Sequence, residues 1–271
     1  MLIDFHVHTF PDKLAAGAVA SLAEKAHFHP YTDGTVAATD ALMAEGGVSR
    51  YVALNIAVSP RSERHVNDFA LSLLGRENIV PFGSVHPASA NALAEIGRLA
   101  DAGVKGVKFH NEYQNFFVDD EAAMPLYEAC AARGLIMLFH GGADRGFAPP
   151  ADLAGKRREV KTAPARMRRV AERFLGAKIV VAHLGGQEML EDAVSFLADT
   201  GVYIDTSFAS RTVSPADGAA VVRAFGAGRV LFGTDCPWDT PQNTVAWVES
   251  LGLSSQEKEL VYFRNALRLL G

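Results

Sequence analysis

Residues 1–10 read MLIDFHVHTF and place Asp4, His6 and His8 at every second position of an otherwise apolar stretch. In a β-strand these three side chains point to one face, while the apolar side chains between them point to the other. Burying three polar groups together without partners would be strongly unfavourable. The stretch therefore predicts a strand whose polar face binds something, and carboxylate and imidazole are both metal-binding groups.

The composition is that of an ordinary soluble globular protein. The chain has 271 residues, of which 49% are hydrophobic and 21% charged, and its net charge is −5. This acidic balance argues against nucleic-acid and anionic-membrane partners. No apolar run approaches a membrane span, no signal-type segment opens the sequence, and Cys130 and Cys236 are the only cysteines. We expect a cytoplasmic protein that acts on a small molecule, with a homodimer as one oligomeric state compatible with the sequence.

Strand-type runs alternate with helix-type segments along the whole sequence. This alternation predicts parallel strands joined by crossover helices, and eight such units close most naturally into a (β/α)8 TIM barrel. An open doubly wound sheet is the alternative. We expect one domain over residues 1–271. The expected strands are 2–8, 51–56, 79–85, 104–110, 135–140, 178–183, 202–207 and 230–235, and the expected helices are 35–46, 62–74, 88–101, 121–133, 164–175, 187–199, 215–225, 241–251 and 255–270.

Two connections are longer than the others, namely residues 9–34 after the first strand and 141–163 after the fifth. Both follow the carboxyl ends of strands, which is the face where TIM barrels carry their active sites. Loops of this length usually act as lids or binding loops, and we expect that role for both.

Histidine and aspartate residues gather at the expected strand ends. His6 and His8 end the first strand, whereas His140, His183 and Asp235 end the fifth, sixth and eighth. Because the strand ends of a barrel converge on one funnel, these side chains should meet there. Imidazole and carboxylate at this density suit a divalent ion, with Zn²⁺ expected first and Mn²⁺ or Fe²⁺ also compatible.

Five motifs together resemble the amidohydrolase superfamily, and within it the branch called amidohydrolase 2. The resemblance covers essentially the whole chain. It implies that His6, His8, His140 and Asp235 bind one metal ion, and that His183 is the acid/base group beside a metal-bound water. A divalent ion lowers the pKa of its water to about 7, and a neighbouring neutral imidazole can then relay the proton. The motifs are DFHVH (4–8), LFHGG (138–142), AHLGG (182–186), YIDTS (203–207) and FGTDCPW (232–238).

The fourth strand leaves the number of metal ions open. Residues 104–114 read VKGVKFHNEYQ, which puts Lys108 and His110 on one strand face with Glu112 just beyond. In two-metal branches of the superfamily, a carbamylated lysine or a glutamate at this strand bridges the ions. Lys108 could be that bridge, His110 an extra ligand or substrate contact, and Glu112 a general base, with His183 also bound to the second ion. Members near this branch usually keep a single ion, and we expect one here.

Four more side chains are expected around the site. Asp4 lies one step deeper than the histidines on the same strand face, so it should orient a histidine ligand, with a purely structural carboxylate as the alternative. Arg145 and Arg211 follow the fifth and seventh strands, where a guanidinium could hold a substrate carboxylate through two hydrogen bonds. His86 ends the third strand and should line the funnel wall.

Three functions remain open from the sequence. The first is a metal-dependent hydrolase of a small carboxylate-bearing amide, lactone or ester. The second is a non-oxidative decarboxylase or hydratase of an unsaturated or aromatic acid. The third is a non-catalytic metal-binding protein on the same scaffold. The strand-end residues do not separate the first two, because both reactions use a Lewis-acid metal and a proton relay, and a fold by itself does not fix a reaction.

Overall fold

All eight expected strands are present in the structure, a computed structural model that describes residues 1–144, 146 and 159–271. Each strand overlaps its expected range. Neighbouring strands pair in parallel, as alternating strands and helices require. The strands are β1 (Ile3–Val7), β2 (Arg50–Leu54), β3 (Ile79–Phe82), β4 (Gly106–Phe109), β5 (Ile136–Phe139), β6 (Ile179–Val181), β7 (Tyr203–Asp205) and β8 (Val230–Leu231).

The strands form two ladders, β1–β2–β3 and β4–β5–β6–β7–β8, which are joined beyond the end of β3. Gly83 follows β3 and pairs with Val107 of β4. Its amide donates to the carbonyl of Gly106 over 3.0 Å, and its carbonyl accepts from the amide of Lys108 over 2.8 Å. These two hydrogen bonds carry the sheet continuously from the first ladder into the second.

The second junction brings the end of the chain's last strand against its first. The amide of Phe5 donates to the carbonyl of Phe232 over 2.7 Å, and the amide of Asp235 donates to the carbonyl of His6 over 2.9 Å. With both junctions hydrogen-bonded, the eight strands form a closed ring. The predicted (β/α)8 barrel is therefore confirmed.

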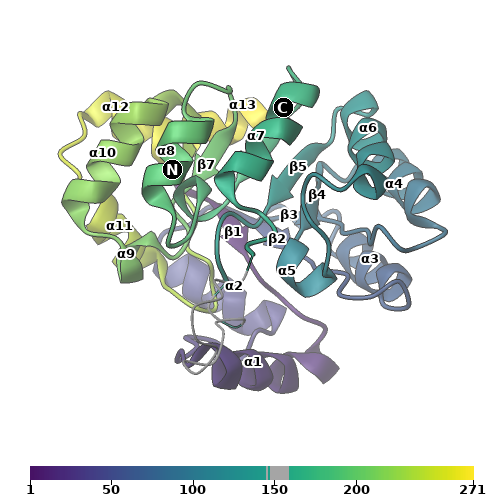
Figure 1. Cartoon of the computed structure of the whole chain (residues 1–271). Coiled ribbons are helices and arrows are strands. Elements are labelled where there is room, and N and C mark those ends of the chain that lie inside the picture. Colours follow the sequence, from purple (N-terminus) through teal and green to yellow (C-terminus); the bar gives the residue numbers. More distant parts are fainter. Residues whose placement is uncertain (145, 147–158) are drawn as a thin grey trace, which may run out of the picture.

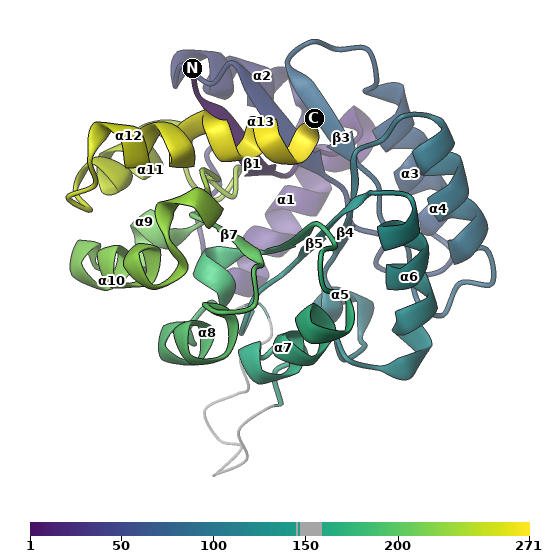
Figure 2. The same ribbon diagram turned by 90° about the horizontal axis from the view of Figure 1, so that it is seen from above.

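The helices form an outer layer around the strands, as the view in Figure 2 shows. Each expected helix is present, although residues 255–270 are divided by a π-helical turn (Leu260–Arg264). No helix among the described residues is both long and apolar enough to cross a bilayer. The helices are α1 (Asp12–Ala26), α2 (Val36–Glu45), α3 (Glu63–Ser72), α4 (Ala92–Asp101), α5 (Asn111–Gln114), α6 (Met124–Ala132), α7 (Pro164–Arg173), α8 (Leu190–Leu197), α9 (Ala209–Thr212), α10 (Pro215–Phe225), α11 (Pro241–Glu249), α12 (Ser255–Glu259) and α13 (Asn265–Leu270), with short 3₁₀ turns at Glu121–Ala123, His183–Gly185 and Ala227–Arg229.

Helix α1 is the main element that the sequence pattern does not predict. It lies inside the long connection 9–34, which was expected only as a lid or binding loop. The segment is rich in alanine, the residue with the highest helix propensity, but it lacks a broad apolar stripe. Only Ala15 and Val19 of α1 are buried. A helix that buries so little of its surface gives a weak periodic signal in the sequence.

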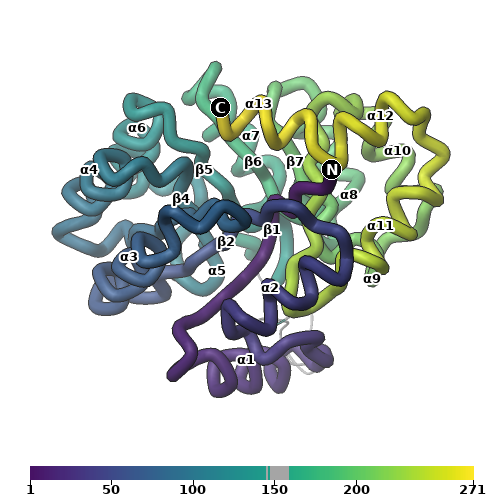
Figure 3. Tube along the Cα trace, turned by 180° about the vertical axis from the view of Figure 1, so that it is seen from behind, coloured from purple at the N-terminus to yellow at the C-terminus, as the bar shows by residue number. Residues whose placement is uncertain are grey.

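The two ends of the barrel are closed differently. At one end, α13 packs Ala266, Leu269 and Leu270 against inward-facing strand residues such as Phe5 and Leu138. At the other end lies α1, as Figures 1 and 3 show from opposite sides. Because α13 fills the amino-terminal end with apolar side chains, an accessible site has room only at the carboxyl ends of the strands, beneath α1.

Asp4 ties β1 to the segment after β8 at the closing junction. Its carboxylate is fully buried and accepts hydrogen bonds from the hydroxyl of Thr234 (2.6 Å), the amide of Thr234 (3.0 Å) and the amide of His6 (3.0 Å). Burial raises the pKa of Asp4 to about 7, although the three hydrogen bonds oppose this rise. The native state therefore keeps a proton on Asp4 that the unfolded chain releases in mild acid.

This raised pKa predicts a pH-dependent cost to stability. Between about pH 4 and pH 7 the native state binds more protons than the unfolded state, so the free energy of unfolding falls as the pH rises, by at most about 1.4 kcal/mol per pH unit. Asp4→Asn resembles the protonated side chain and should remove this dependence. Its stability relative to the wild type should therefore increase from about pH 5 to pH 8 in urea unfolding of the metal-free protein. Asp101→Asn, which removes an exposed carboxylate at the end of α4, is the control and should show no such increase. If Asp4→Asn behaves like this control, the buried proton on Asp4 is disproved.

Candidate functional site

A cavity of about 590 Å³ opens at the carboxyl ends of the strands, beneath α1. Its floor brings together polar side chains from β1, β4, β5, β6 and β8 that are far apart in the sequence. This convergence is the one expected from the strand-end pattern. The polar side chains of the floor are His6, His8, Lys108, His110, His140, His183 and Asp235.

His6 is held in one tautomer by a buried carboxylate. Its Nδ1 lies 2.8 Å from Oδ2 of Asp205, an acceptor, so Nδ1 carries the ring proton and Nε2 presents a lone pair to the cavity. Burial lowers the pKa of His6 well below its usual value, and the nearby charge of Lys108 acts in the same direction. His6 is therefore a neutral imidazole, the form that binds metal ions.

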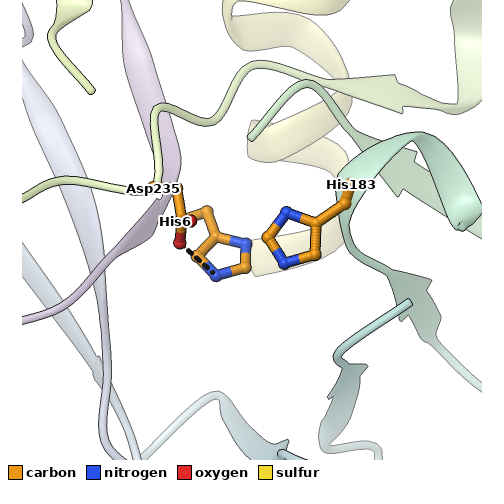
Figure 4. A group of neighbouring side chains, drawn as sticks. All are labelled: His6, His183 and Asp235. Carbon is orange, nitrogen blue, oxygen red and sulfur yellow. Dashed lines mark ion pairs between the residues drawn. The ribbon is translucent and has the colours of Figure 1, made fainter. Parts of the chain in front are cut away.

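His8 presents a second lone pair to the same point. Its Nδ1 lies 3.1 Å from the carbonyl oxygen of Leu54, which leaves Nε2 without a proton. That Nε2 lies 3.3 Å from Nε2 of His6, and Oδ1 of Asp235 lies 3.2 Å from His6 and 3.3 Å from His8. Figure 4 shows Asp235 beside the His6 ring. Two imidazole nitrogens and a carboxylate oxygen thus face one another at close range, an arrangement that suits a shared cation.

His183 faces this group from β6 (Figure 4). The donor atoms of His6, His183 and Asp235 all lie within 4.8 Å of one another. Nδ1 of His183 lies 3.2 Å from the carbonyl oxygen and 2.9 Å from Oγ of Ser207, whose hydroxyl itself donates to Asp205. Nδ1 therefore carries the proton, and the ring turns its Nε2 lone pair toward the cavity.

His140 supplies a fourth lone pair. Its Nδ1 lies 3.0 Å from the Nε2 acceptor of His183 and so donates to it. The remaining Nε2 of His140 is buried and has no hydrogen-bond partner among the described residues. Burial lowers the pKa of His140 well below its usual value, with contributions from His110 and His183, so the ring is neutral. A buried imidazole nitrogen that accepts no hydrogen bond is typical of a metal ligand.

Glycines in the LFHGG motif allow β5 and β6 to approach closely enough for this contact. A Cβ on Gly141 would lie 2.3 Å from the carbonyl oxygen of Ala182, and one on Gly142 would lie 2.4 Å from the backbone of Gln187. Gly142 also adopts a φ of +75°, which favours glycine. The two glycines therefore let His140 lie beside His183.

Two of the site residues adopt unfavourable backbone conformations. His183 has a φ of 57° and Asp235 a φ of 69°, both in the left-handed region that costs about 1–2 kcal/mol for a residue with a Cβ. Hydrogen bonds hold each of them in place, from the His183 amide to Asp205 (2.9 Å) and from the Asp235 amide to the His6 carbonyl (2.9 Å). Such strain at the end of a strand is typical of a functional site.

The donor set fits a divalent cation. Burial disfavours ionisation of Asp235, yet its interactions with His6 and His8 outweigh burial and hold its pKa below the usual value. The floor therefore offers one carboxylate and several neutral imidazole lone pairs. Nitrogen and oxygen donors of this kind suit Zn²⁺ and also Mn²⁺ or Fe²⁺.

Lys108 approaches the same group from β4. Its side chain is fully buried, and its Nζ lies 3.4 Å from Nε2 of His6. Burial lowers the pKa of Lys108 to about 8, against the opposing charges of Asp205, Asp235 and Asp144. An ammonium group with such a lowered pKa can hold a developing negative charge or release its proton near neutral pH.

His110 belongs to a second, adjoining group. Its ring stacks on that of His140, with centroids 4.3 Å apart and planes inclined by 18°. Its Nε2 lies 3.3 Å from Oδ2 of Asp144, and donor atoms of His110, His140 and Asp144 lie within 4.8 Å of one another. Asp144 was not expected at the site, because it lies in a connection rather than at a strand end.

Glu112 and His86 do not line the cavity. Oε1 of Glu112 accepts a hydrogen bond from the amide of Lys161 over 3.0 Å, because the short helix α5 begins directly after β4 and turns this side chain away. Nδ1 of His86 accepts from the amide of Ala88 over 3.1 Å within its own turn. The expected placement of Glu112 as a general base and of His86 in the funnel wall is therefore wrong.

Of the two arginines expected to hold a substrate carboxylate, Arg211 is not found at the cavity. Arg211 is exposed, donates to the hydroxyl of Tyr31 over 2.9 Å, and does not line the cavity. Arg211 lies within the short helix α9, which carries its side chain outward along the surface. The prediction for Arg211 is therefore wrong. Arg145 lies outside the described residues.

The carboxylate that orients a histidine ring is Asp205 rather than Asp4. The partners of Asp4 are a hydroxyl and two backbone amides, so its expected contact with an imidazole is not made. Asp205 bonds the His6 ring and also the amide of His183. The sequence signal for this role was the YIDTS motif, in which Asp205 ends β7.

Comparisons with known proteins agree with this geometry. A family model described as Amidohydrolase matches residues 3–271. No curated protein matches the sequence. The chain is similar to the solved structure of 5-carboxyvanillate decarboxylase from Sphingomonas paucimobilis, with 18% identity, a TM-score of 0.73, and coverage of 99% of this chain and 98% of that one.

Two further solved structures are similar over almost their whole length. One is a dihydroxybenzoic acid decarboxylase from a Polaromonas species with bound manganese and an inhibitor, at 15% identity and a TM-score of 0.71, covering 99% of this chain and 96% of that one. The other is a putative 2-pyrone-4,6-dicarboxylic acid hydrolase from Pseudomonas putida, at 18% identity and a TM-score of 0.65, covering 100% and 97%. At these identities the likeness establishes the fold.

The contact between Asp205 and His6 predicts an effect on metal affinity. Asp205→Asn keeps an oxygen for the amide of His183 but turns a nitrogen donor toward Nδ1 of His6, so His6 must move its proton to Nε2. The affinity for Zn²⁺ or Mn²⁺ should fall by about 10–100-fold, measured by competition with a chromophoric chelator. His86→Gln, outside the cavity, should leave the affinity unchanged. Equal affinities in the two variants would show that Asp205 does not set the state of His6.

Proposed function

The chain belongs to the amidohydrolase family, and we propose that it is a metal-dependent hydrolase that cleaves a C–N or C–O bond of a small organic substrate with a metal-activated water. The observation that carries this proposal is the convergence of imidazole nitrogens and a carboxylate on one point of the cavity floor, together with the buried Nε2 of His140 that has no hydrogen-bond partner among the described residues. Two reduced, buried cysteines, Cys130 and Cys236, are in keeping with the cytoplasmic location that we also propose.

We propose that His6, His8, His140 and Asp235 hold one divalent ion, with zinc as the first candidate and manganese or iron(II) as alternatives. When bound, such an ion polarises the reacting oxygen of the substrate and makes water nucleophilic at neutral pH. A second ion bridged by carbamylated Lys108 is the alternative. The position of Glu112 away from the cavity argues against its part in such a site.

His183 is proposed as the acid/base group. Its Nδ1 is anchored on Ser207, its Nε2 accepts a hydrogen bond from Nδ1 of His140, and donor atoms of His183, His6 and Asp235 lie within 4.8 Å of one another. Nε2 can accept the proton of the attacking water and later donate it to the leaving nitrogen or oxygen. The anchored Nδ1 keeps the ring in the orientation that this transfer needs.

Lys108 is proposed to stabilise negative charge on the substrate. It is the ammonium group in the described cavity floor, 3.4 Å from His6. A donor fixed in a buried site stabilises a developing oxyanion more strongly than the same group in water. In this proposal Lys108 is the cationic anchor, a role that was expected of Arg145 and Arg211.

A non-oxidative decarboxylase is the second candidate, and the apolar walls of the cavity favour it. Apolar surroundings destabilise a substrate carboxylate relative to neutral CO₂. In this reaction the bond from carbon to the carboxylate breaks, CO₂ leaves, and the carbon takes a proton, which Nε2 of His183 can relay from water. Two of the similar solved structures are named as decarboxylases. A non-catalytic metal-binding protein would have no use for the oriented His183, which makes it the weakest reading.

The division of roles between the histidines predicts distinct mutant phenotypes. His183→Asn should keep close to one metal ion per chain in elemental analysis, while kcat falls by about 10²–10⁴-fold, the usual effect of losing an acid/base group. His8→Ala should lose most of its metal, because it removes a ligand. If both variants lose metal equally, His183 is a ligand and the assignment fails. Two ions per wild-type chain with a carbamate mass on Lys108 would contradict the single-ion proposal.

Turnover on a matched panel decides between the two reactions. The protein reconstituted with Zn²⁺ or Mn²⁺ should be assayed on lactones, esters and amides, with acid release as the readout. Aromatic carboxylic acids should be assayed in parallel for CO₂ release. We expect hydrolysis, with His183→Asn as the negative control. CO₂ release without hydrolysis would establish the decarboxylase instead.

A further inference from the structure

The walls of the cavity are apolar above the polar floor. They are built by segments that meet only in the fold: Phe10 and Phe28 flank α1, Leu22 belongs to α1, Phe69 to α3, and Trp238 follows β8. The ring of Phe28 meets that of Phe208 edge to face, with centroids 4.8 Å apart. Aromatic and aliphatic side chains thus face the cavity above the proposed metal ligands.

The cavity is large compared with a small aromatic acid. An apolar cavity of about 150 Å³ is enough for one benzene molecule, whereas this cavity measures about 590 Å³. Ordinary ligand sites occupy about 300–1,000 Å³ and cover most of their ligand's surface. A substrate that fills this site therefore extends well beyond a single ring.

The charged side chains that line the cavity limit the chemistry of the part of the substrate that lies above the floor. Among the described lining residues Lys108, in the floor, is the only lysine or arginine, and Arg211 does not line the cavity. A second carboxylate beside Phe10, Leu22 and Phe69 would lie against apolar side chains, at a substantial desolvation cost. The described walls therefore favour apolar groups over a second carboxylate at this place.

The apolar surface continues to the mouth of the cavity. Leu14 is 63% exposed and Val58 is 51% exposed, and both line the same cavity. Apolar side chains that are half in solvent become covered when an apolar ligand binds, which contributes favourably to affinity. The described surface from the mouth to the floor is therefore mostly apolar.

We infer that the substrate has one polar reacting group attached to a bulky apolar alkyl or aryl body, and that this body lies against the wall formed by Phe10, Leu22, Phe28, Phe69 and Trp238. The inference rests on the proposed function, because it assumes that the reacting group lies at the metal ligands in the floor. It adds the substrate class, which neither the polar floor nor the family specifies. Helix α1 is thereby assigned a specificity-determining role.

A binding experiment tests this without requiring turnover. Linear alkyl hydroxamates from two to eight carbons place a metal-binding group on the floor and an apolar chain against the wall. Their dissociation constants for the Zn²⁺-loaded protein should tighten by up to about fourfold per added methylene group, in isothermal titration calorimetry. The heat-capacity change of binding should become more negative along the series.

Two matched variants locate the effect. Leu22→Ser should flatten the dependence on chain length, whereas Leu93→Ser, which alters a 51% exposed leucine on α4 outside the cavity, should follow the wild type. Phe69→Ser gives a second test from a different wall element. A dependence that is flat in the wild type, or equal in Leu22→Ser and Leu93→Ser, overturns the inference, as does the absence of hydroxamate binding to metal-loaded protein.

Failure of the inference can be told from failure of the proposed function. Chain-length-dependent binding without hydrolysis or CO₂ release would support the apolar substrate body and contradict the proposed reaction. Hydrolysis of short substrates with kcat/KM independent of chain length would support the reaction and contradict the apolar substrate body.

Discussion

The hydrogen bond from Nδ1 of His6 to Asp205 is the interaction on which the site depends. It fixes the tautomer of His6 and thereby decides that a lone pair, and not a proton, faces His8 and Asp235. The other oxygen of Asp205 accepts from the amide of His183 and from Ser207, which in turn fixes the tautomer of His183. One buried carboxylate on β7 thus sets the protonation of imidazoles on two other strands. The residue that hydrogen-bonds a metal ligand therefore controls metal binding as much as the ligand itself does.

Strand positions could be predicted from the sequence because each strand carries its own signal. Inward polar residues at strand ends, such as His140 and Asp235, follow from alternation and barrel closure alone. Contacts between elements could not be predicted, since they depend on where connections turn. Helix α5 carries Glu112 away from the cavity and α9 carries Arg211 to Tyr31, although both residues follow strand ends. The sequence does not distinguish the roles of Asp4 and Asp205. In the fold, β8 packs against β1, so that Asp4 accepts from Thr234 and Asp205 contacts the His6 ring.

The geometry of the floor is maintained against local backbone preference. His183 and Asp235 both have positive φ, and Gly141 and Gly142 permit an approach of β5 to β6 that any side chain would prevent. These features would be unfavourable in a purely structural barrel. Their unfavourable free energy is offset by apolar packing at the opposite end of the barrel, where α13 covers the interior around Phe5 and Leu138. The end of the barrel that stabilises the fold is thus opposite to the end that carries the candidate site.

Helix α1, which covers the site, also contributes little to the stability of the barrel. It buries only Ala15 and Val19, and Gly17 near its middle faces open space, so few contacts tie the helix to the barrel. An element with so few buried contacts opens at a lower free energy than the barrel unfolds. Substitutions in α1 can therefore accumulate without endangering the fold or disturbing the floor. Among descendants of such a scaffold, the chemistry would be inherited with the strands, while the range of molecules admitted could diverge through this one helix.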